Sequence, residues 1–147
     1  MEVVKIIQWD MGHRVMNHRS VCKGLHGHRY KAEISVKGDL VDVDGVSEEG
    51  MVIDFSDIKK LSLSLVHSKL DHSFMVWEKD KEMIDFFDSS DGHKPVVVPF
   101  TPTVENVAKY IFDILSPQII DKYGNGIYLS SIKVWETPTS FAIYSGK

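Results

Sequence analysis

The sequence has almost no capacity for disulfide bonding, because Cys22 is the single cysteine among 147 residues. One cysteine cannot form a disulfide within the chain, which is typical of proteins from a reducing compartment such as the cytosol. Cationic residues are also few: 17 Lys and Arg stand against 21 Asp and Glu, for a formal net charge of -4. They are scattered rather than clustered, so the sequence predicts no nucleic-acid partner.

Long apolar runs are missing as well. No stretch approaches the roughly 18 apolar residues of a membrane-spanning helix, and residues 1–13 lack the basic start and apolar middle of a signal peptide. We therefore expect a cytoplasmic protein with no membrane contact. No Gly-rich dinucleotide loop is present, which argues against a nicotinamide cofactor. Apolar residues make up 43% of the chain, enough for one core, and we expect a single domain over residues 1–147.

Four segments have the patterns of β-strands. Residues 29–37 alternate strictly, with apolar side chains on one face and mostly charged side chains on the other. Residues 2–9 are rich in β-branched residues and predict the strand before it. After the turn-rich segment KYGNG, two further strands are expected at residues 127–136 and 140–146.

Two helices are predicted between these strand pairs. The first follows Asp54 as N-cap, carries apolar residues at helical spacing and should end near Lys69. The second is capped by Thr101 or Thr103 and should be terminated by Pro117.

Residues 73–100 show no strong pattern and are interpreted as a connection, with a possible short helix at residues 79–87. The resulting order is β, β, α, α, β, β. Strand pairs and helix pairs that are segregated along the chain favour an α+β fold with an antiparallel sheet.

Three histidines form a candidate metal site. His26 and His28 lie two residues apart at the start of the alternating strand, so both project from its apolar face. If the first two strands form a hairpin, His13 at the end of the first strand lies across from them. Three imidazoles with one open position are typical of catalytic zinc. The alternative is that these are ordinary hydrogen-bonded histidines, as we expect for surface residues His18, His67 and His93.

Cys22 lies in the loop that leads into the His-Gly-His strand, next to Lys23. A cation and a metal nearby would favour the thiolate, which serves as a base or a nucleophile. Packing and metal ligation are the other two roles open to this side chain.

Two carboxylates are candidates for further roles. Asp71 precedes His72 directly after the first predicted helix, where a turn can bring the two side chains together for proton transfer. A plain surface turn is the alternative. Glu136 points with the apolar residues of its strand, and no Arg or Lys nearby in the sequence shares that face. Either a ligand with two adjacent N–H donors, such as a pterin edge, binds this carboxylate, or the strand end exposes it.

Six short motifs occur in the order found in the 6-pyruvoyl-tetrahydropterin synthase superfamily, which the chain resembles over nearly its whole length. These are GHR (12–14), C-x-x-x-H-G-H (22–28), GMVIDF (50–55), LDH (70–72), PTVEN (102–106) and ET (136–137). Three residues between the cysteine and His-Gly-His resemble the bacterial 6-carboxytetrahydropterin synthases of 7-deazaguanine (queuosine) synthesis. The 6-pyruvoyl enzymes usually have five.

The resemblance implies a tunnelling (T-) fold, in which a four-stranded antiparallel sheet carries two helices on one face. It implies subunits joined into a homo-oligomer, commonly a hexamer, with active sites between subunits. It further implies Zn²⁺ on His13, His26 and His28. The implied proton-transfer groups are Cys22, Asp71 and His72, and Glu136 is the implied pterin anchor.

The implied reaction is that of a lyase. It converts 7,8-dihydroneopterin triphosphate to 6-carboxy-5,6,7,8-tetrahydropterin with loss of triphosphate and acetaldehyde. The alternatives are 6-pyruvoyl-tetrahydropterin formation, which uses the same substrate and metal, and a non-catalytic module in which zinc stabilises the hairpin. Two features depart from the family pattern, namely Met11 and Gly12 in place of two small residues, and the long connection 73–100.

Overall fold

The computed structural model describes residues 1–146, and its centre is a long antiparallel hairpin. Strand β1 (Glu2–His13) pairs with β2 (His26–Gly38) along its whole length, from Glu2 opposite Lys37 to His13 opposite His26. Both strands extend beyond the predicted segments 2–9 and 29–37. Apolar alternation continues at the end of β1, where every second residue up to His13 is buried, and this burial holds the extra residues in the sheet.

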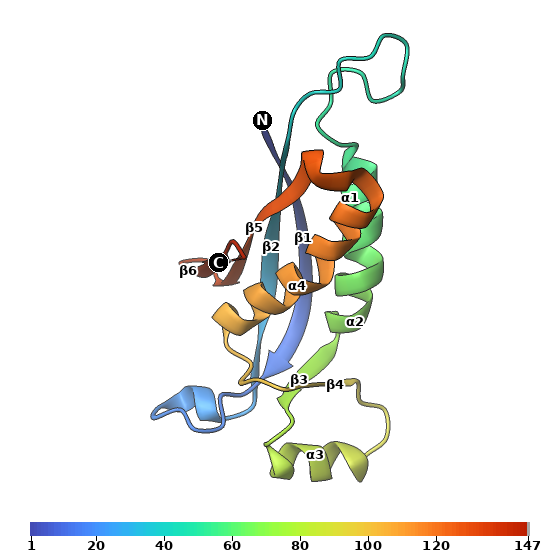
Figure 1. The fold of residues 1–147 in the computed structure, drawn as a ribbon. Coiled ribbons are helices and arrows are strands. Elements are labelled where there is room, and N and C mark those ends of the chain that lie inside the picture. Colours follow the sequence, from blue (N-terminus) through green and yellow to red (C-terminus); the bar gives the residue numbers. More distant parts are fainter. Residues whose placement is uncertain (147) are drawn as a thin grey trace.

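The sheet contains six strands in the spatial order β4-β3-β1-β2-β5-β6 and curls along its length (Figure 1). The four strands that flank the hairpin are β3 (Ser73–Trp77), β4 (Pro95–Val98), β5 (Ile127–Thr137) and β6 (Ser140–Tyr144). Strand β5 pairs antiparallel with β2, and β6 pairs antiparallel with β5, as predicted.

The prediction of a four-stranded antiparallel sheet is wrong on the other side of the hairpin. There β3 pairs parallel with the end of β1, and β4 pairs parallel with β3, within the segment predicted to be a connection. A parallel pair requires a crossover between its strands, and the helical segment after β2 supplies it. The sheet is therefore mixed, and the fold is α+β.

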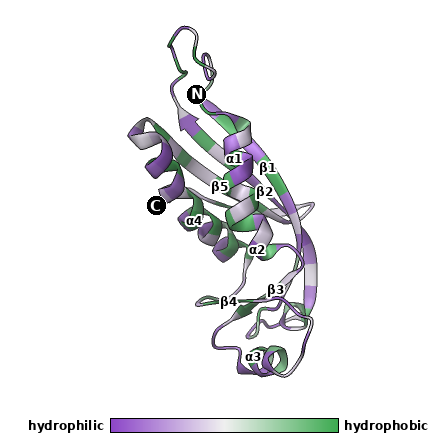
Figure 2. Cartoon of the chain, turned by 90° about the vertical axis from the view of Figure 1, so that its right-hand side faces the viewer, coloured by the Kyte–Doolittle hydropathy of each residue, from purple (hydrophilic) through white to green (hydrophobic). Residues whose placement is uncertain are grey.

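The helices cover one face of the sheet, with hydrophobic positions turned toward the strands (Figure 2). Helix α1 (Phe55–Ser62) begins after Asp54, whose side chain accepts a hydrogen bond from the Ser56 amide. It continues through a wider π-helical turn into α2 (Ser68–Leu70), which ends where the sequence predicts. None of the helices within residues 1–146 has the length and apolarity of a membrane span.

Helix α4 (Val104–Tyr123) begins as predicted, with Thr103 accepting from the Asn106 amide, but it does not stop at Pro117. A proline removes one helical hydrogen bond, to the carbonyl four residues earlier, here that of exposed Asp113. Water can satisfy that carbonyl, while buried Ile119 packs the next turn into the core. The helix therefore continues to Tyr123.

A third helix, α3 (Lys81–Asp88), lies in the connection 73–100, at the end of the molecule away from the loop 39–54 (Figure 1). Asp80 caps it, and its carboxylate receives two hydrogen bonds from Arg14, of 2.6 and 2.7 Å. The Asp80 side chain is 3% exposed. This ion pair fixes the connection to the end of β1, next to His13.

We expect Asp80→Asn to lower the free energy of unfolding at pH 7 by about 2 kcal/mol, because it removes the buried carboxylate that accepts two hydrogen bonds from Arg14 and leaves the guanidinium only the exposed carboxylate of Glu82 as a charged partner. The Arg14 guanidinium holds the pKa of Asp80 below its usual range. The pKa of Asp80 is lower in the folded chain than in the unfolded chain, where it is near 4, so the ion pair stabilises the fold fully at pH values above about 4. That contribution is lost as the pH falls through the pKa of Asp80 in the folded chain.

Urea unfolding at pH 7 and at pH 3.5 measures this contribution, and the difference between wild type and variant should narrow at the lower pH. Asp85→Asn is the matched control, since Asp85 is an exposed carboxylate of the same helix. Equal stability of the two variants at pH 7 would contradict the role of the ion pair.

Candidate active site

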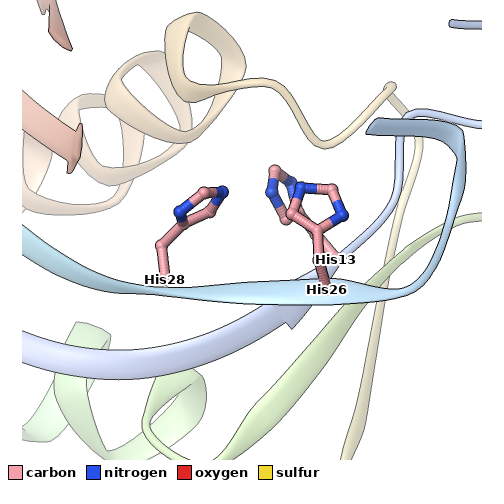
Figure 3. A group of neighbouring side chains, drawn as sticks. All are labelled: His13, His26 and His28. Atoms are coloured by element: carbon pink, nitrogen blue, oxygen red, sulfur yellow. The ribbon is translucent and has the colours of Figure 1, made fainter. Parts of the chain in front are cut away.

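The hairpin brings the three predicted metal ligands together at its end (Figure 3). His13 and His26 are directly opposite across β1 and β2, and His28 follows two residues along the same face. The ring centroids lie 4.5 to 5.2 Å apart. One nitrogen of each ring lies within 4.8 Å of the corresponding nitrogens of the other two.

Two of the rings are oriented by hydrogen bonds to backbone carbonyls. The Nδ1 atom of His13 lies 2.6 Å from the Pro102 carbonyl oxygen, and the Nδ1 atom of His26 lies 2.8 Å from that of Gly24. A carbonyl oxygen only accepts, so each Nδ1 carries the hydrogen and the lone pair is on Nε2. Metal-binding histidines commonly show this arrangement, in which one ring nitrogen donates to a carbonyl oxygen and the other is left for the metal.

His13 is the most buried ligand candidate, with 2% of its surface exposed. Burial lowers the pKa of His13, and nearby His26 and His28 act in the same direction, against the Pro102 hydrogen bond and the Glu136 charge. The ring is therefore neutral at pH 7, the form that binds a metal. Its Nε2 atom is buried and has no hydrogen-bond partner in the structure.

These observations fit a zinc site. A buried polar atom without a partner is costly, and here it faces two further imidazoles whose ligand atoms converge. Three nitrogen donors with room for one more ligand are the donor set of catalytic zinc.

Glu136 on β5 lies beside the triad, as its position in the strand predicts. Its Oε1 atom is 3.6 Å from Nε2 of His13 and 4.0 Å from Nε2 of His28, too far for hydrogen bonds. The side chain is 23% exposed, so neither full burial nor simple strand-end exposure describes it.

Tyr30 is a site residue that the sequence did not indicate. It is fully buried under the triad, stacked on Trp9, and its hydroxyl has no hydrogen-bond partner. Burial, and secondly the Glu136 carboxylate, raises the pKa of Tyr30 above its usual range. The alternation of residues 29–37 predicted only an apolar position here, since a tyrosine hydroxyl leaves no mark on the hydrophobic pattern.

Cys22 shares a cavity of about 340 Å³ with His13, His26 and Glu136. It lies in a 3₁₀ turn, Val21–Lys23, where the thiol is neither fully buried nor paired with another cysteine. His18, expected on the surface, is half-buried and lines the same cavity.

Asp71 and His72 meet as the sequence allowed. Nδ1 of His72 lies 2.8 Å from Oδ2 of Asp71, and Oδ1 of Asp71 accepts a hydrogen bond from the Asp10 amide at 3.1 Å. These two bonds, the Asp10 amide first, lower the pKa of Asp71, which keeps it a carboxylate at neutral pH. The His72 side chain is 80% exposed and free to contact another molecule.

The structure does not bring His72 to Cys22 within one chain. His72 lines a second cavity, of about 520 Å³, with Asp10, Gly12 and Phe74; His28 of the triad also lines it, but Cys22 does not. Asp10 and Gly12 alternate with buried Met11 and His13 along β1, so their side of the sheet is the one opposite the triad.

Comparison with known proteins gives a consistent set of relatives. Residues 2–147 match the family model described as 6-pyruvoyl tetrahydropterin synthase. The chain is 34% identical to the 6-carboxy-5,6,7,8-tetrahydropterin synthase of Rickettsia felis, covering 92% of this chain and 93% of the relative. It is also 34% identical to the synthase of that name from Haemophilus influenzae, covering 97% of each. An uncharacterized protein from Wolinella succinogenes has a similar fold, with a TM-score of 0.81, 22% identity, and coverage of 100% of this chain and 98% of that one.

Proposed function

Because the chain belongs to the 6-pyruvoyl tetrahydropterin synthase family of lyases, we propose that it is a zinc-dependent 6-carboxy-5,6,7,8-tetrahydropterin synthase. Its substrate is 7,8-dihydroneopterin triphosphate, and its products are 6-carboxytetrahydropterin, acetaldehyde and triphosphate, within 7-deazaguanine (queuosine) synthesis in the cytosol. The proposal rests on the convergence of three imidazoles, two of which, His13 and His26, share a cavity with Cys22 and Glu136.

The ligands of the metal are His13, His26 and His28. When bound, zinc supplies Lewis-acid polarisation of the oxygens on the substrate's side chain. The chain contributes the orientation of the rings, since the Pro102 and Gly24 carbonyls hold two of them with Nε2 toward the site. Burial of His13 keeps that ring neutral and ready to bind.

Two groups move protons. Cys22 lies on the triad's side of the sheet and takes a carbon-bound proton from the substrate's side chain as a general base. His72, oriented by Asp71, serves as the second proton-transfer group. Because these residues line different cavities, we propose that His72 acts in the site of a second copy of the chain. In a homo-oligomer such as a hexamer, two subunits would then form each active site.

Glu136 anchors the pterin through two hydrogen bonds that its carboxylate accepts from adjacent N–H groups of the ring. Glu136→Gln should raise KM about 30-fold, because an amide accepts only one of the two bonds and the loss of a charge-assisted bond costs about 2 kcal/mol. Steady-state kinetics with zinc-loaded protein measures the change.

Glu105→Gln is the control for the anchor, since Glu105 lines the same cavity at the start of α4. We expect it to leave KM within about twofold of the wild-type value, in the range of neutral surface changes. Zinc content should be normal in both variants. Unchanged KM in Glu136→Gln would contradict the anchor, and loss of zinc would make the carboxylate a metal ligand instead.

The reaction itself is tested by its small product. Acetaldehyde release in step with triphosphate release marks cleavage of the substrate's carbon-carbon bond. The 6-pyruvoyl alternative releases triphosphate without acetaldehyde. The proposal favours cleavage because three residues separate Cys22 from the His-Gly-His motif, and relatives named 6-carboxy synthases match over more than 90% of the chain. Triphosphate release without acetaldehyde would overturn it.

A further inference from the structure

His72 has a strained backbone. Its φ of 58° is the only positive value at a non-glycine residue within the described part of the chain. This left-handed conformation is unfavourable for a residue with a Cβ atom and persists only where neighbouring groups hold it. Such strain is common at functional sites, and the groups that hold His72 in this conformation therefore bear on its proposed role.

The peptide unit between Asp71 and His72 is held at both of its polar ends. Its N–H donates to the Asp10 carbonyl oxygen at 2.8 Å, which ties it to β1. Its C=O accepts from the ammonium group of Lys94 at 2.9 Å. Lys94 Nζ also donates at 2.7 Å to the carbonyl of Ser68 in the last turn of α2. None of these bonds involves the imidazole of His72, which remains exposed.

Lys94 is itself fixed by its backbone. It directly precedes β4, and its carbonyl oxygen accepts a 3.0 Å hydrogen bond from the Phe74 amide at the start of β3. The segment 73–100 therefore presents one lysine side chain to the turn that carries the Asp71–His72 pair. One of its acceptors lies in the last turn of α2 and the other directly after it, and carbonyls at the end of a helix are acceptors that a lysine satisfies well.

A peptide unit that rotates changes ψ of the residue before it and φ of the residue after it. Rotation of the unit between Asp71 and His72 would relieve the positive φ, and it would turn both the C=O and the N–H away from their present partners. We propose that Lys94 is a positioning residue that blocks this rotation and so holds His72 against Asp71 for proton transfer. The catalytic role of His72 in this inference rests on the proposed function, whereas the restraint of the peptide unit by Lys94 does not.

The test replaces Lys94 with methionine, which keeps the aliphatic stem and removes the donor. We expect kcat to fall about 10- to 100-fold, as for a misplaced catalytic group, with KM and zinc content unchanged. Lys94→Arg, which can still donate to two carbonyls, should restore most of the activity. Lys79→Met is the matched control, because Lys79 is a lysine of the same segment that lies over the Trp77 ring instead.

A second measurement does not depend on turnover. Hydrogen exchange of the His72 amide, resolved by NMR in the protein without substrate, should accelerate about tenfold in Lys94→Met, because rotation breaks its bond to Asp10. Exchange of the Phe74 amide, which bonds the Lys94 backbone, should not change. Acceleration at both amides would indicate general loosening of the segment. Unchanged exchange at His72 would show that Lys94 does not hold this peptide unit. Either result would overturn the proposal.

The two measurements separate the inference from the function on which it rests. If the wild-type chain turns over no pterin, the proposed function fails and the exchange rates still decide whether Lys94 holds the peptide. If Lys94→Met accelerates exchange at His72 alone but leaves kcat unchanged, positioning by Lys94 has no catalytic consequence and the proposal is wrong.

Discussion

Replacing Cys22 with alanine is expected to lower kcat about 1,000-fold, the range that a positioned acid or base contributes, while zinc content and thermal stability stay at wild-type values. Cys22 lines the same cavity as His13 and His26 of the triad, where a substrate bound at the metal would be within its reach. The turn around it is held by backbone bonds, from the Val15 amide to the Cys22 carbonyl and from the Gly24 amide to the Val21 carbonyl. Removing the thiol should not disturb either.

Kinetics, metal analysis and thermal unfolding of the purified variant measure these three quantities. Val21→Ala is the control, since this neighbour in the same turn is 88% exposed. Full activity of Cys22→Ala would exclude a chemical role for this thiol. Loss of zinc from the variant would instead identify the thiol as a ligand, the role that three imidazoles make unnecessary.

Replacing His28 with alanine is expected to abolish turnover, because it removes one of three metal ligands. Zinc affinity should fall by more than about 100-fold, the upper end of what loss of an outer-shell partner costs. The fold should persist, since β1 and β2 are paired through their backbones and the His28 side chain is partly exposed. Competition with a chelator measures the affinity.

His18→Ala is the matched control for the ligand set, since His18 lines the same cavity as Cys22 but lies outside the triad. It should bind zinc as wild type does. Its Nδ1 atom accepts a hydrogen bond from the Ser20 amide at 3.1 Å and lies 2.9 Å from the Ser20 hydroxyl. Equal zinc affinity in His28→Ala and His18→Ala would contradict the assignment of the metal site.

The histidine triad was predictable because it depends on two simple rules of strand geometry. Period-two alternation places His26 and His28 on one face, and pairing of neighbouring strands in a hairpin places His13 opposite. The observed register has His13 directly across from His26. The sequence could not indicate that the Pro102 carbonyl orients His13, because that contact joins residues 89 positions apart.

The parallel strands β3 and β4 were not predictable in the same way. Each has five residues or fewer, and apolar runs of that length fit strands, helices and buried loops equally well. What makes them strands is the free edge of β1 near His13, to which β3 adds three residue pairs. That edge exists only after the hairpin has formed, so its use is a tertiary effect.

The Asp71–His72 pair lies between these cases. Adjacency in a turn after a helix allowed the two side chains to meet, and they do so at 2.8 Å. The positive φ of His72 carries no signal in the sequence, since glycine or asparagine is the usual residue at such a position. The contact from Lys94 also has none, because it depends on where β4 joins the sheet.

The dependence of turnover on zinc tests the central claim most directly. Metal-free protein is titrated with zinc in the presence of 7,8-dihydroneopterin triphosphate, and the pterin product is identified by mass. We expect turnover to rise from zero in proportion to added zinc and to reach its plateau at about one zinc per chain, the capacity of one three-histidine site. The product should be 6-carboxytetrahydropterin. Full turnover in the metal-free protein, or a zinc-loaded protein that leaves the substrate unchanged, would contradict it.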